Sequence, residues 1–345
     1  MRIPRSIFLL ATTAFLLAVP AQRVHAQAAS TLHPENVIGN ARCEECHKEE
    51  LQAWKVSTHA RSDSVHRDPK TKDKAAEIAK AMGISSVNEI AAHPLCTECH
   101  FTRQKEGGTV KVIGGVSCES CHGGAKEWRD VHGNRDKLPD RAKRQELSKA
   151  AGMLYPEDTY AVAQNCFNCH VVRDEDLVVK GGHPARSEGF NLVSWSQGEV
   201  RHNFYTPTFE RVEDKNLETR PERKRMFLVV GMLLDLEYSL RGLANGKVGG
   251  GPYRQAMGKR AHTIINAELP VVLKALGGDG APAEIKEIAE IAKGINLSAA
   301  PAEMTKAADE VGAKAKAFSD AHDGSAMAGI DALVPSASKG KAWAP

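Results

Sequence analysis

The sequence reads Cys43-Glu44-Glu45-Cys46-His47, and it repeats the pattern Cys-x-x-Cys-His at 96–100, 118–122 and 166–170. This pattern is the attachment site of c-type haem, in which two thiols form thioether bonds and the histidine binds iron. All eight cysteines belong to it: Cys43, Cys46, Cys96, Cys99, Cys118, Cys121, Cys166 and Cys169. We therefore expect four covalently bound haem c groups, with proximal iron ligands His47, His100, His122 and His170.

Paired cysteines also occur in two other kinds of site. Cys-x-x-Cys units also build zinc ribbons, and eight cysteines in a secreted protein can form four disulfides. Neither alternative explains why a histidine follows the second cysteine in every copy, so haem is the preferred interpretation.

The N-terminus has the pattern of a secretory signal peptide. Arg2 and Arg5 precede an apolar stretch at 6–19, and Val24-His25-Ala26 is a small-x-Ala cleavage signal. We expect a signal peptide at 1–26, with cleavage after Ala28 as the second choice. No later stretch is long and apolar enough to cross a bilayer. The expected location is therefore the periplasm, as a soluble exported protein, which is also where haem is attached to this motif.

The net charge gives no sign of nucleic-acid binding. The formal charge is +3 at pH 7, and it includes Arg2, Arg5 and Arg23 of the expected signal peptide, so the mature chain is close to neutral. Basic residues are scattered among acidic ones, and aromatic residues make up 5% of the chain. Neither a basic face nor a stacking platform for bases is visible.

The chain divides into parts of different composition. We expect a mainly α fold in which a multihaem cytochrome domain at 36–205, with little regular secondary structure, is followed by a small helical bundle at 221–323. Only 109–112 resembles a strand in the first part. The tail at 335–345 is expected to be disordered.

Apolar periodicity predicts four helices in the second part. One stripe runs from Val229 to Leu243 at three- and four-residue steps, with Asp235, Glu237 and Arg241 on the other side. A second helix starts at Pro252 and ends or kinks at Pro270. A third follows Pro282 and stops at Gly294. A fourth follows Pro301; its stripe consists of Met304, Ala308, Val311, Ala315 and Phe318. Short connections between such helices indicate an antiparallel bundle.

Further histidines are candidates for the sixth position of each iron. His59 lies twelve residues after His47 along a segment with helical character, which puts it about 18 Å along the helix axis. It cannot close the haem that His47 holds and must serve another one. The same argument applies to His132, which lies ten residues after His122.

On these residues the chain resembles the tetrahaem cytochrome c-554 family. The resemblance rests on Trp54 and His59 after the first motif and on Gly-Val-Ser-Cys-Glu-Ser-Cys-His-Gly at 115–123, and it covers roughly 41–170. It implies that His132 closes the first haem, on His47, and that His59 closes the fourth, on His170. It also implies that the second haem, on His100, is five-coordinate. If that iron has a sixth ligand, the candidates are His66 and His93.

The chain departs from that family after His170. The resemblance implies that the third haem, on His122, takes a histidine from later in the chain, and we expect His183 to supply it, with His202 as the alternative. The helical part after Pro221 has no counterpart in the small family. It is a candidate docking module or subunit interface, through which a homo-oligomer or a complex would form.

The preferred function is electron transfer between exported redox proteins. Iron with two histidine ligands has no free coordination site and can only change its oxidation state. Members of the resembling family take electrons from hydroxylamine oxidoreductase. The alternative is a haem enzyme that reduces or oxidises nitric oxide, hydroxylamine or nitrite at a five-coordinate haem on His100. No catalytic acid or base can be assigned near it.

Overall fold

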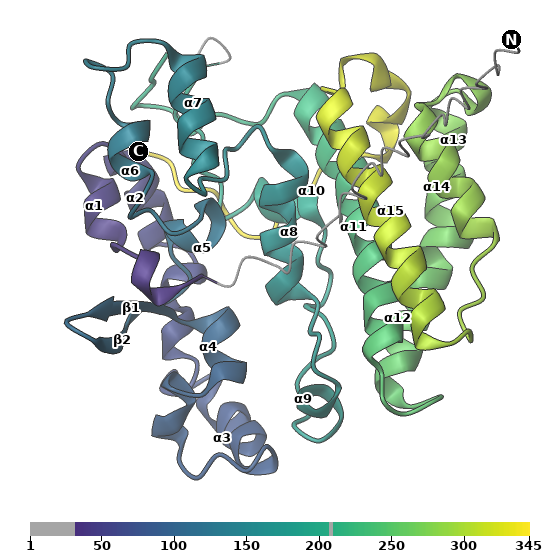
Figure 1. Ribbon diagram of the computed structural model, residues 1–345, viewed down its shortest axis with the longest axis horizontal. Helices are drawn as coiled ribbons and strands as arrows, with labels where there is room; N and C mark the ends of the chain where they lie inside the picture. The colour runs from purple at the N-terminus through teal and green to yellow at the C-terminus, as the bar shows by residue number, and fades with distance from the viewer. Residues whose placement is uncertain (1–31, 207–209) are drawn as a thin grey trace, which may run out of the picture.

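Helices provide almost all of the regular structure in the computed structural model, which describes residues 32–206 and 210–345. Figure 1 shows a loosely built N-terminal part beside a group of long helices. The expectation of a mainly α protein with little regular structure around the motifs is confirmed. The expected signal peptide at 1–26 lies outside the described residues. None of the described helices is both long enough and apolar enough to span a membrane.

The N-terminal part consists of short helices joined by irregular segments. Its elements are η1 (Pro34–Asn36), α1 (Asn40–Glu44), α2 (Lys48–Lys55), η2 (His59–Ser64), α3 (Lys72–Ala81), η3 (Val87–Ala91), α4 (Pro94–His100), β1 (Thr102–Glu106), β2 (Thr109–Gly114), α5 (Cys118–His122), α6 (Arg129–His132), α7 (Arg141–Ala150), α8 (Thr159–His170), α9 (Glu175–Val179) and α10 (Leu192–Ser196). Strands β1 and β2 form an antiparallel hairpin in which Arg103 lies opposite Val112. The strand expected at 109–112 is therefore present.

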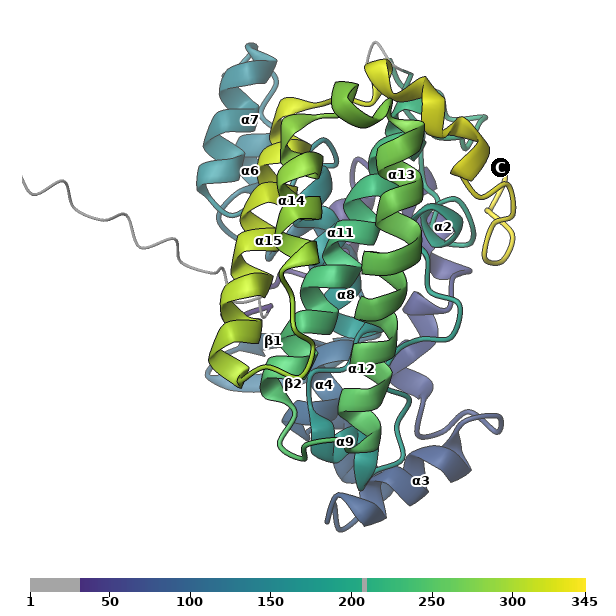
Figure 2. The ribbon, with the colours of Figure 1, turned by 90° about the vertical axis from the view of Figure 1, so that its right-hand side faces the viewer.

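The C-terminal part contains α11 (Pro221–Asn245), α12 (Pro252–Thr263), the π-helical turn η4 (Ile264–Glu268), α13 (Leu269–Ala275), η5 (Gly278–Gly280), α14 (Ala283–Lys293), α15 (Pro301–Ala321) and η6 (Ser325–Leu333). All four expected helices are present. Figure 2 shows α12, α13, α14 and α15 in front of α11. The stripe of α11 from Val229 to Leu243 and the stripe of α15 are buried as expected.

The centre of the bundle differs from the expectation in one respect. Asp235 and Glu237 were placed on an exposed side of α11, but both are buried. Helix α11 is covered on several sides, by α15, α12 and α8, so it has no solvent face in its middle. Arg186 and Arg260 pair with Asp235, and Arg241 pairs with Glu237, at 2.7–2.8 Å. The buried carboxylates therefore have charged partners, as burial requires.

The second helix of the bundle passes Pro270 instead of ending there. Proline has no N–H to donate to the carbonyl four residues earlier. The chain widens into the π-helical turn at Ile264–Glu268 immediately before Pro270 and then continues as α13. A widened turn is a common way to fit an irregularity into a continuous helix, which explains why the expected kink leaves the helix unbroken.

The core of the bundle continues into the haem-motif part. A single cluster of buried apolar side chains includes Tyr160 and Phe167 of α8 together with Val230 and Leu234 of α11. Tyr160 also donates a hydrogen bond of 2.6 Å to Glu237. The division into domains at 36–205 and 221–323 therefore separates two parts that share apolar packing.

The C-terminal tail is ordered by contacts, which corrects the expectation of disorder at 335–345. The N–H of Lys339 donates to the carbonyl of Ser194 at 2.9 Å, and the Lys339 carbonyl accepts from the N–H of Glu199. The ring of Trp343 lies 6.0 Å from that of Phe204. The tail is polar and rich in small residues, which is typical of disorder. It is held by partners that only the folded protein brings together.

Candidate haem-binding sites

Each Cys-x-x-Cys-His motif is built on the end of a helical turn. His100, His122 and His170 are the last residues of α4, α5 and α8, and His47 directly precedes α2. One helical turn puts the cysteines at positions i and i+3 on the same face. The eight cysteines carry no disulfide bonds. Their thiols are therefore presented in pairs, each with a histidine at the helix end.

The structure brings four pairs of histidine rings together. The ring centres of His47 and His132 are 6.2 Å apart, and those of His59 and His170 are 6.1 Å apart. These are the two partnerships that the family resemblance implies. The ring centres of His100 and His183 are 6.4 Å apart, and those of His122 and His202 are 6.3 Å apart. Each pair joins one motif histidine to one histidine from elsewhere in the chain.

These separations suit an iron ion between each pair of rings. Transition metal–imidazole bonds are about 2 Å long, so two of them with the adjoining halves of the rings give roughly 6 Å between ring centres. All four separations lie within 0.3 Å of one another. The residues present therefore fit haem irons with two axial histidines.

The Nδ1 atoms of several paired histidines contact neutral protein oxygens. Nδ1 of His122 lies 3.0 Å from the Leu154 carbonyl, and Nδ1 of His170 lies 2.8 Å from the hydroxyl of Ser187. Corresponding Nδ1 contacts join His132 to the Tyr155 hydroxyl, His183 to the Pro184 carbonyl and His202 to the Val200 carbonyl. A proton on Nδ1 that is held in this way leaves Nε2 free as a ligand.

Burial favours the neutral form of these rings. Desolvation is the largest cause that lowers the pKa to about 4 in His100, His122, His132 and His170. The pKa of His59 is also lowered, chiefly by burial. Neutral imidazole is the form that ligates a metal. The sites therefore present their ligands in the required protonation state at neutral pH.

The surroundings of His47 are different because its Nδ1 faces a carboxylate. Nδ1 lies 3.4 Å from Oε1 of Glu50, whose side chain is 14% exposed. Arg211 forms two contacts with the Glu50 carboxylate, at 2.9 and 3.0 Å, and one with Glu49. Burial would raise the pKa of Glu50, but its hydrogen bonds to His47 and Arg211 outweigh that effect and lower the pKa to about 2. Glu50 is therefore ionised beside His47.

The partners of the second and third motifs differ from the expectation. His183 was expected to serve the haem on His122, but its ring faces His100, and His202 faces His122 instead. After His170 the chain forms a bridge between Val171 and Arg186. The loop closed by this bridge includes α9 and brings His183 toward α4. Sequence spacing gave no information about that turn.

The five-coordinate haem expected on His100 is at odds with this arrangement. The ring of His183 faces that of His100, with centres 6.4 Å apart, so a second histidine lies beside this motif. Of the other two candidates for a sixth ligand, His66 has its ring centre 5.8 Å from that of Phe101. The Nδ1 atoms of both His66 and His93 are buried without a hydrogen-bond partner among the described residues.

Contacts between motifs indicate their order in space. The side chain of Cys43 lies next to that of Cys118, and the side chain of Cys99 lies next to that of Cys169. The amide of Asn165, next to Cys166, donates to the Cys121 carbonyl at 2.9 Å. The first motif is therefore next to the third, the third next to the fourth, and the fourth next to the second.

Several residues around the sites were not assigned roles from the sequence. The ring of Phe190 stacks on His170 with centres 4.6 Å apart, and Trp195 meets the same histidine edge-on at 4.9 Å. Glu50, Tyr155 and Ser187 carry no sequence signal that would distinguish them. A charged residue three positions after a motif histidine is too common to predict a contact.

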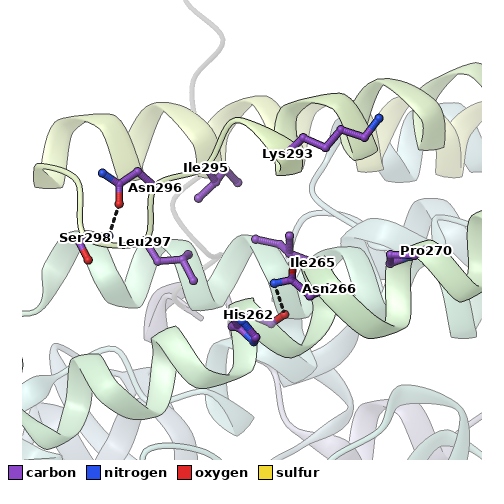
Figure 3. A pocket seen from close by; sticks show the side chains of 9 residues that line it. All are labelled: His262, Ile265, Asn266, Pro270, Lys293, Ile295, Asn296, Leu297 and Ser298. Carbon is purple, nitrogen blue, oxygen red and sulfur yellow. Dashed lines mark hydrogen bonds between the residues drawn. The ribbon is translucent and has the colours of Figure 1, made fainter.

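Of two hollows in the helical part, one lies away from the histidine pairs and the other borders the fourth motif. One of about 690 Å³ is bordered by His262, Asn266 and Lys293, beside the π-helical turn (Figure 3). Its lining includes no residue of the four motifs. A second, of about 370 Å³, is mostly apolar and includes Phe167 and Phe190 near the fourth motif.

Comparison with known proteins agrees with the motif geometry. Residues 42–123 match the family model described as cytochrome c554 and c-prime. This part of the chain is cytochrome c554-like. Cytochrome c-554 of Nitrosomonas europaea is 28% identical over 143 residues, which are 39% of this chain and 57% of that relative. The match thus spans little more than half of the relative's length. No solved structure matches the chain.

The cytochrome c554-like segment includes the first three motifs in full, and with them Trp54 and His59. Trp54 donates a hydrogen bond of 2.7 Å to the carbonyl of Val116, just before the third motif. It therefore ties the first motif to the third. The similarity supports a c-type cytochrome that binds haem c covalently.

Proposed function

We propose that this protein carries electrons between exported redox proteins through four covalent haem c groups, each with two histidine ligands. The observation that carries the proposal is the set of four histidine pairs with ring centres 6.1–6.4 Å apart. The ligand pairs are His47 with His132, His100 with His183, His122 with His202, and His170 with His59. An iron with six ligands exchanges electrons and does not bind substrates.

The spatial order of the motifs supports a conduit. The contacts between Cys43 and Cys118, and between Cys99 and Cys169, would bring haems attached to these cysteines close together. The haem order would be first, third, fourth and second, counted along the sequence. An electron entering at either end would then reach the other by three short transfers.

Within this function the protein residues hold and insulate the haems. The cysteines fix each porphyrin, and the histidines complete the iron coordination, which bound haem uses for one-electron chemistry. Neutral oxygens such as the Leu154 carbonyl orient the ligand rings through Nδ1. Apolar neighbours such as Phe190 exclude water from the fourth site. We further propose that the protein acts in the periplasm after removal of residues 1–26.

The alternative function, catalysis on a small nitrogen compound, needs an open iron. The position of His183 opposite His100 argues against it. Partners would be proteins that present their own redox centres, and the helical part at 221–323 would serve as a docking module or subunit interface.

The haem count tests the proposal. The mass of the intact, fully matured protein should exceed that of the polypeptide by four haems, and a reductive titration should take up four electrons per molecule. A mass increase of two haems or fewer, in protein produced with haem-attachment machinery, would contradict it. So would fewer than four electrons in protein that carries all four haems.

A further inference from the structure

The carboxylate beside His47 distinguishes the first haem site from the others. Nδ1 of His47 faces Oε1 of Glu50 at 3.4 Å. The five other Nδ1 contacts described above, including those of His122 and His170, are with carbonyl or hydroxyl oxygens, which carry no charge. The first site therefore has a ligand whose far side meets a negative charge.

The position of Glu50 is fixed from two sides. It lies in the first turn of α2, where the free N–H groups of the helix favour a negative side chain. Arg211, which is 22% exposed, reaches from a distant part of the chain and forms a two-pronged pair with the same carboxylate. Planar pairing of this kind holds a carboxylate in one orientation. Glu50 is therefore held in place toward His47 and does not move freely on the surface.

A carboxylate acceptor changes the ligand that the iron experiences. When Nδ1–H donates to an anion, the imidazole becomes more basic and its Nε2 a stronger electron donor. Stronger donation and a nearby negative charge both stabilise ferric over ferrous iron, because the ferric ion carries the greater positive charge. Hydrogen bonding around axial ligands is one of the means by which proteins set haem potentials.

We propose that Glu50 is a positioning residue that lowers the reduction potential of the haem attached at Cys43 and Cys46 through its contact with His47. This inference rests on the proposed function, since it requires a haem at that motif. It means that the potential of the haem at this end of the conduit depends on the Glu50 carboxylate. Arg211 limits the effect because it shares the charge of the same carboxylate.

The test uses the holoprotein with Glu50→Gln, which removes the charge but keeps the size of the side chain. Potentiometric titration followed by electron paramagnetic resonance should show one haem with a higher potential. We expect the ferric-to-ferrous ratio at a fixed potential to fall about tenfold, which is about 59 mV for one electron. His132→Ala identifies the signal that belongs to this haem, because it removes the ligand opposite His47.

Glu49→Gln is the matched control. It removes the same charge from the neighbouring position and weakens the same pairing with Arg211, but Glu49 has no described contact with His47. We expect a much smaller shift. An equal shift in both variants would overturn the proposal in favour of general electrostatics, and an unchanged potential in Glu50→Gln would overturn it directly.

Two further measurements distinguish failure of the Glu50 proposal from failure of the proposed function. If the Glu50→Gln protein loses a haem, Glu50→Asp is the variant to use, because it keeps the charge on a shorter side chain. We expect it to raise the potential of the first haem by a smaller amount. An unchanged potential in this variant would overturn the proposal. A wild-type protein with fewer than four haems, or without low-spin iron at the first motif, would instead contradict the proposed function. Four low-spin haems whose potentials do not change when Glu50 is replaced would contradict the Glu50 proposal but not the proposed function.

Discussion

The imidazole rings of His100 and His183 lie with their centres 6.4 Å apart and their planes at 64°. These residues are 83 positions apart in the chain, and the loop closed by the Val171–Arg186 bridge brings them together. The resembling family implies an open iron at this motif. The arrangement in this chain instead offers a sixth ligand and favours electron transfer over substrate binding.

His183→Ala should open the second haem. Removal of the imidazole opposite His100 leaves the iron with water or no sixth ligand, so one ferric haem changes from low spin to high spin. Reduced protein should then bind one carbon monoxide per molecule. Electron paramagnetic resonance and a carbon monoxide titration measure the two effects. His262→Ala, a change at an exposed position in the bundle, should bind none; carbon monoxide binding equal to that of the control would mean that His183 is not a ligand.

His202→Ala should open the third haem by the same reasoning, since His202 faces His122 at 6.3 Å. The double variant with His183→Ala should bind two carbon monoxide molecules per protein. If both residues competed for a single iron, the double variant would bind one. Replacement of His66, whose ring contacts Phe101, should leave the count at zero.

The sequence was most informative where chemistry is local. Cys-x-x-Cys-His specifies its own geometry within one turn, and the stripe from Val229 to Leu243 specifies a buried helix face. The choice between His183 and His202 depended on a loop whose closure involves Val171 and Arg186, and nothing in the local sequence encodes it. The resemblance implied the pairings of His47 with His132 and of His170 with His59, whose rings the structure brings together, but it implied neither of the ring pairs at the other two motifs.

The remaining differences come from tertiary contacts. The spacing of apolar residues put Asp235 on the side of α11 opposite the apolar stripe. This spacing cannot show that other helices cover α11 on several sides. The composition of the tail at 335–345 is typical of disorder. It does not show that the Ser194 carbonyl accepts a hydrogen bond from the tail and that the Glu199 N–H donates one to it. Glu50 was not predicted for a related reason: its significance depends on Arg211, far away in sequence.

Asp235→Asn should destabilise the junction between the haem-binding part and the bundle. The Asp235 side chain is 5% exposed and pairs with Arg186 and Arg260. Loss of the charge leaves two partly buried arginines without their common partner, which costs about 3–5 kcal/mol in other buried pairs. The midpoint of urea unfolding should fall accordingly. Glu290→Gln, which breaks an exposed pair with Lys293, should change it by less than about 1 kcal/mol.

Deletion of 335–345 should also lower stability. It removes the hydrogen bonds of Lys339 with Ser194 and Glu199 and the contact of Trp343 with Phe204. At about 1 kcal/mol for each hydrogen bond and a similar amount for the aromatic pair, the loss should be about 2–4 kcal/mol. Thermal unfolding followed by haem absorbance measures it. Lys341→Ala, an exposed change in the same tail, is the control; unchanged unfolding after the deletion would show that the tail does not pack as described.

The central claim is that every haem iron in this protein has two histidine ligands, and carbon monoxide binding to the reduced wild-type holoprotein tests it most directly. The sample should first contain four haems by mass and show only low-spin signals when ferric. After reduction is complete, we predict that carbon monoxide causes no further change in the haem absorbance, because the four histidine pairs leave no open position. Binding of one carbon monoxide per protein, with a matching ferric high-spin signal, would contradict the account and restore an open haem.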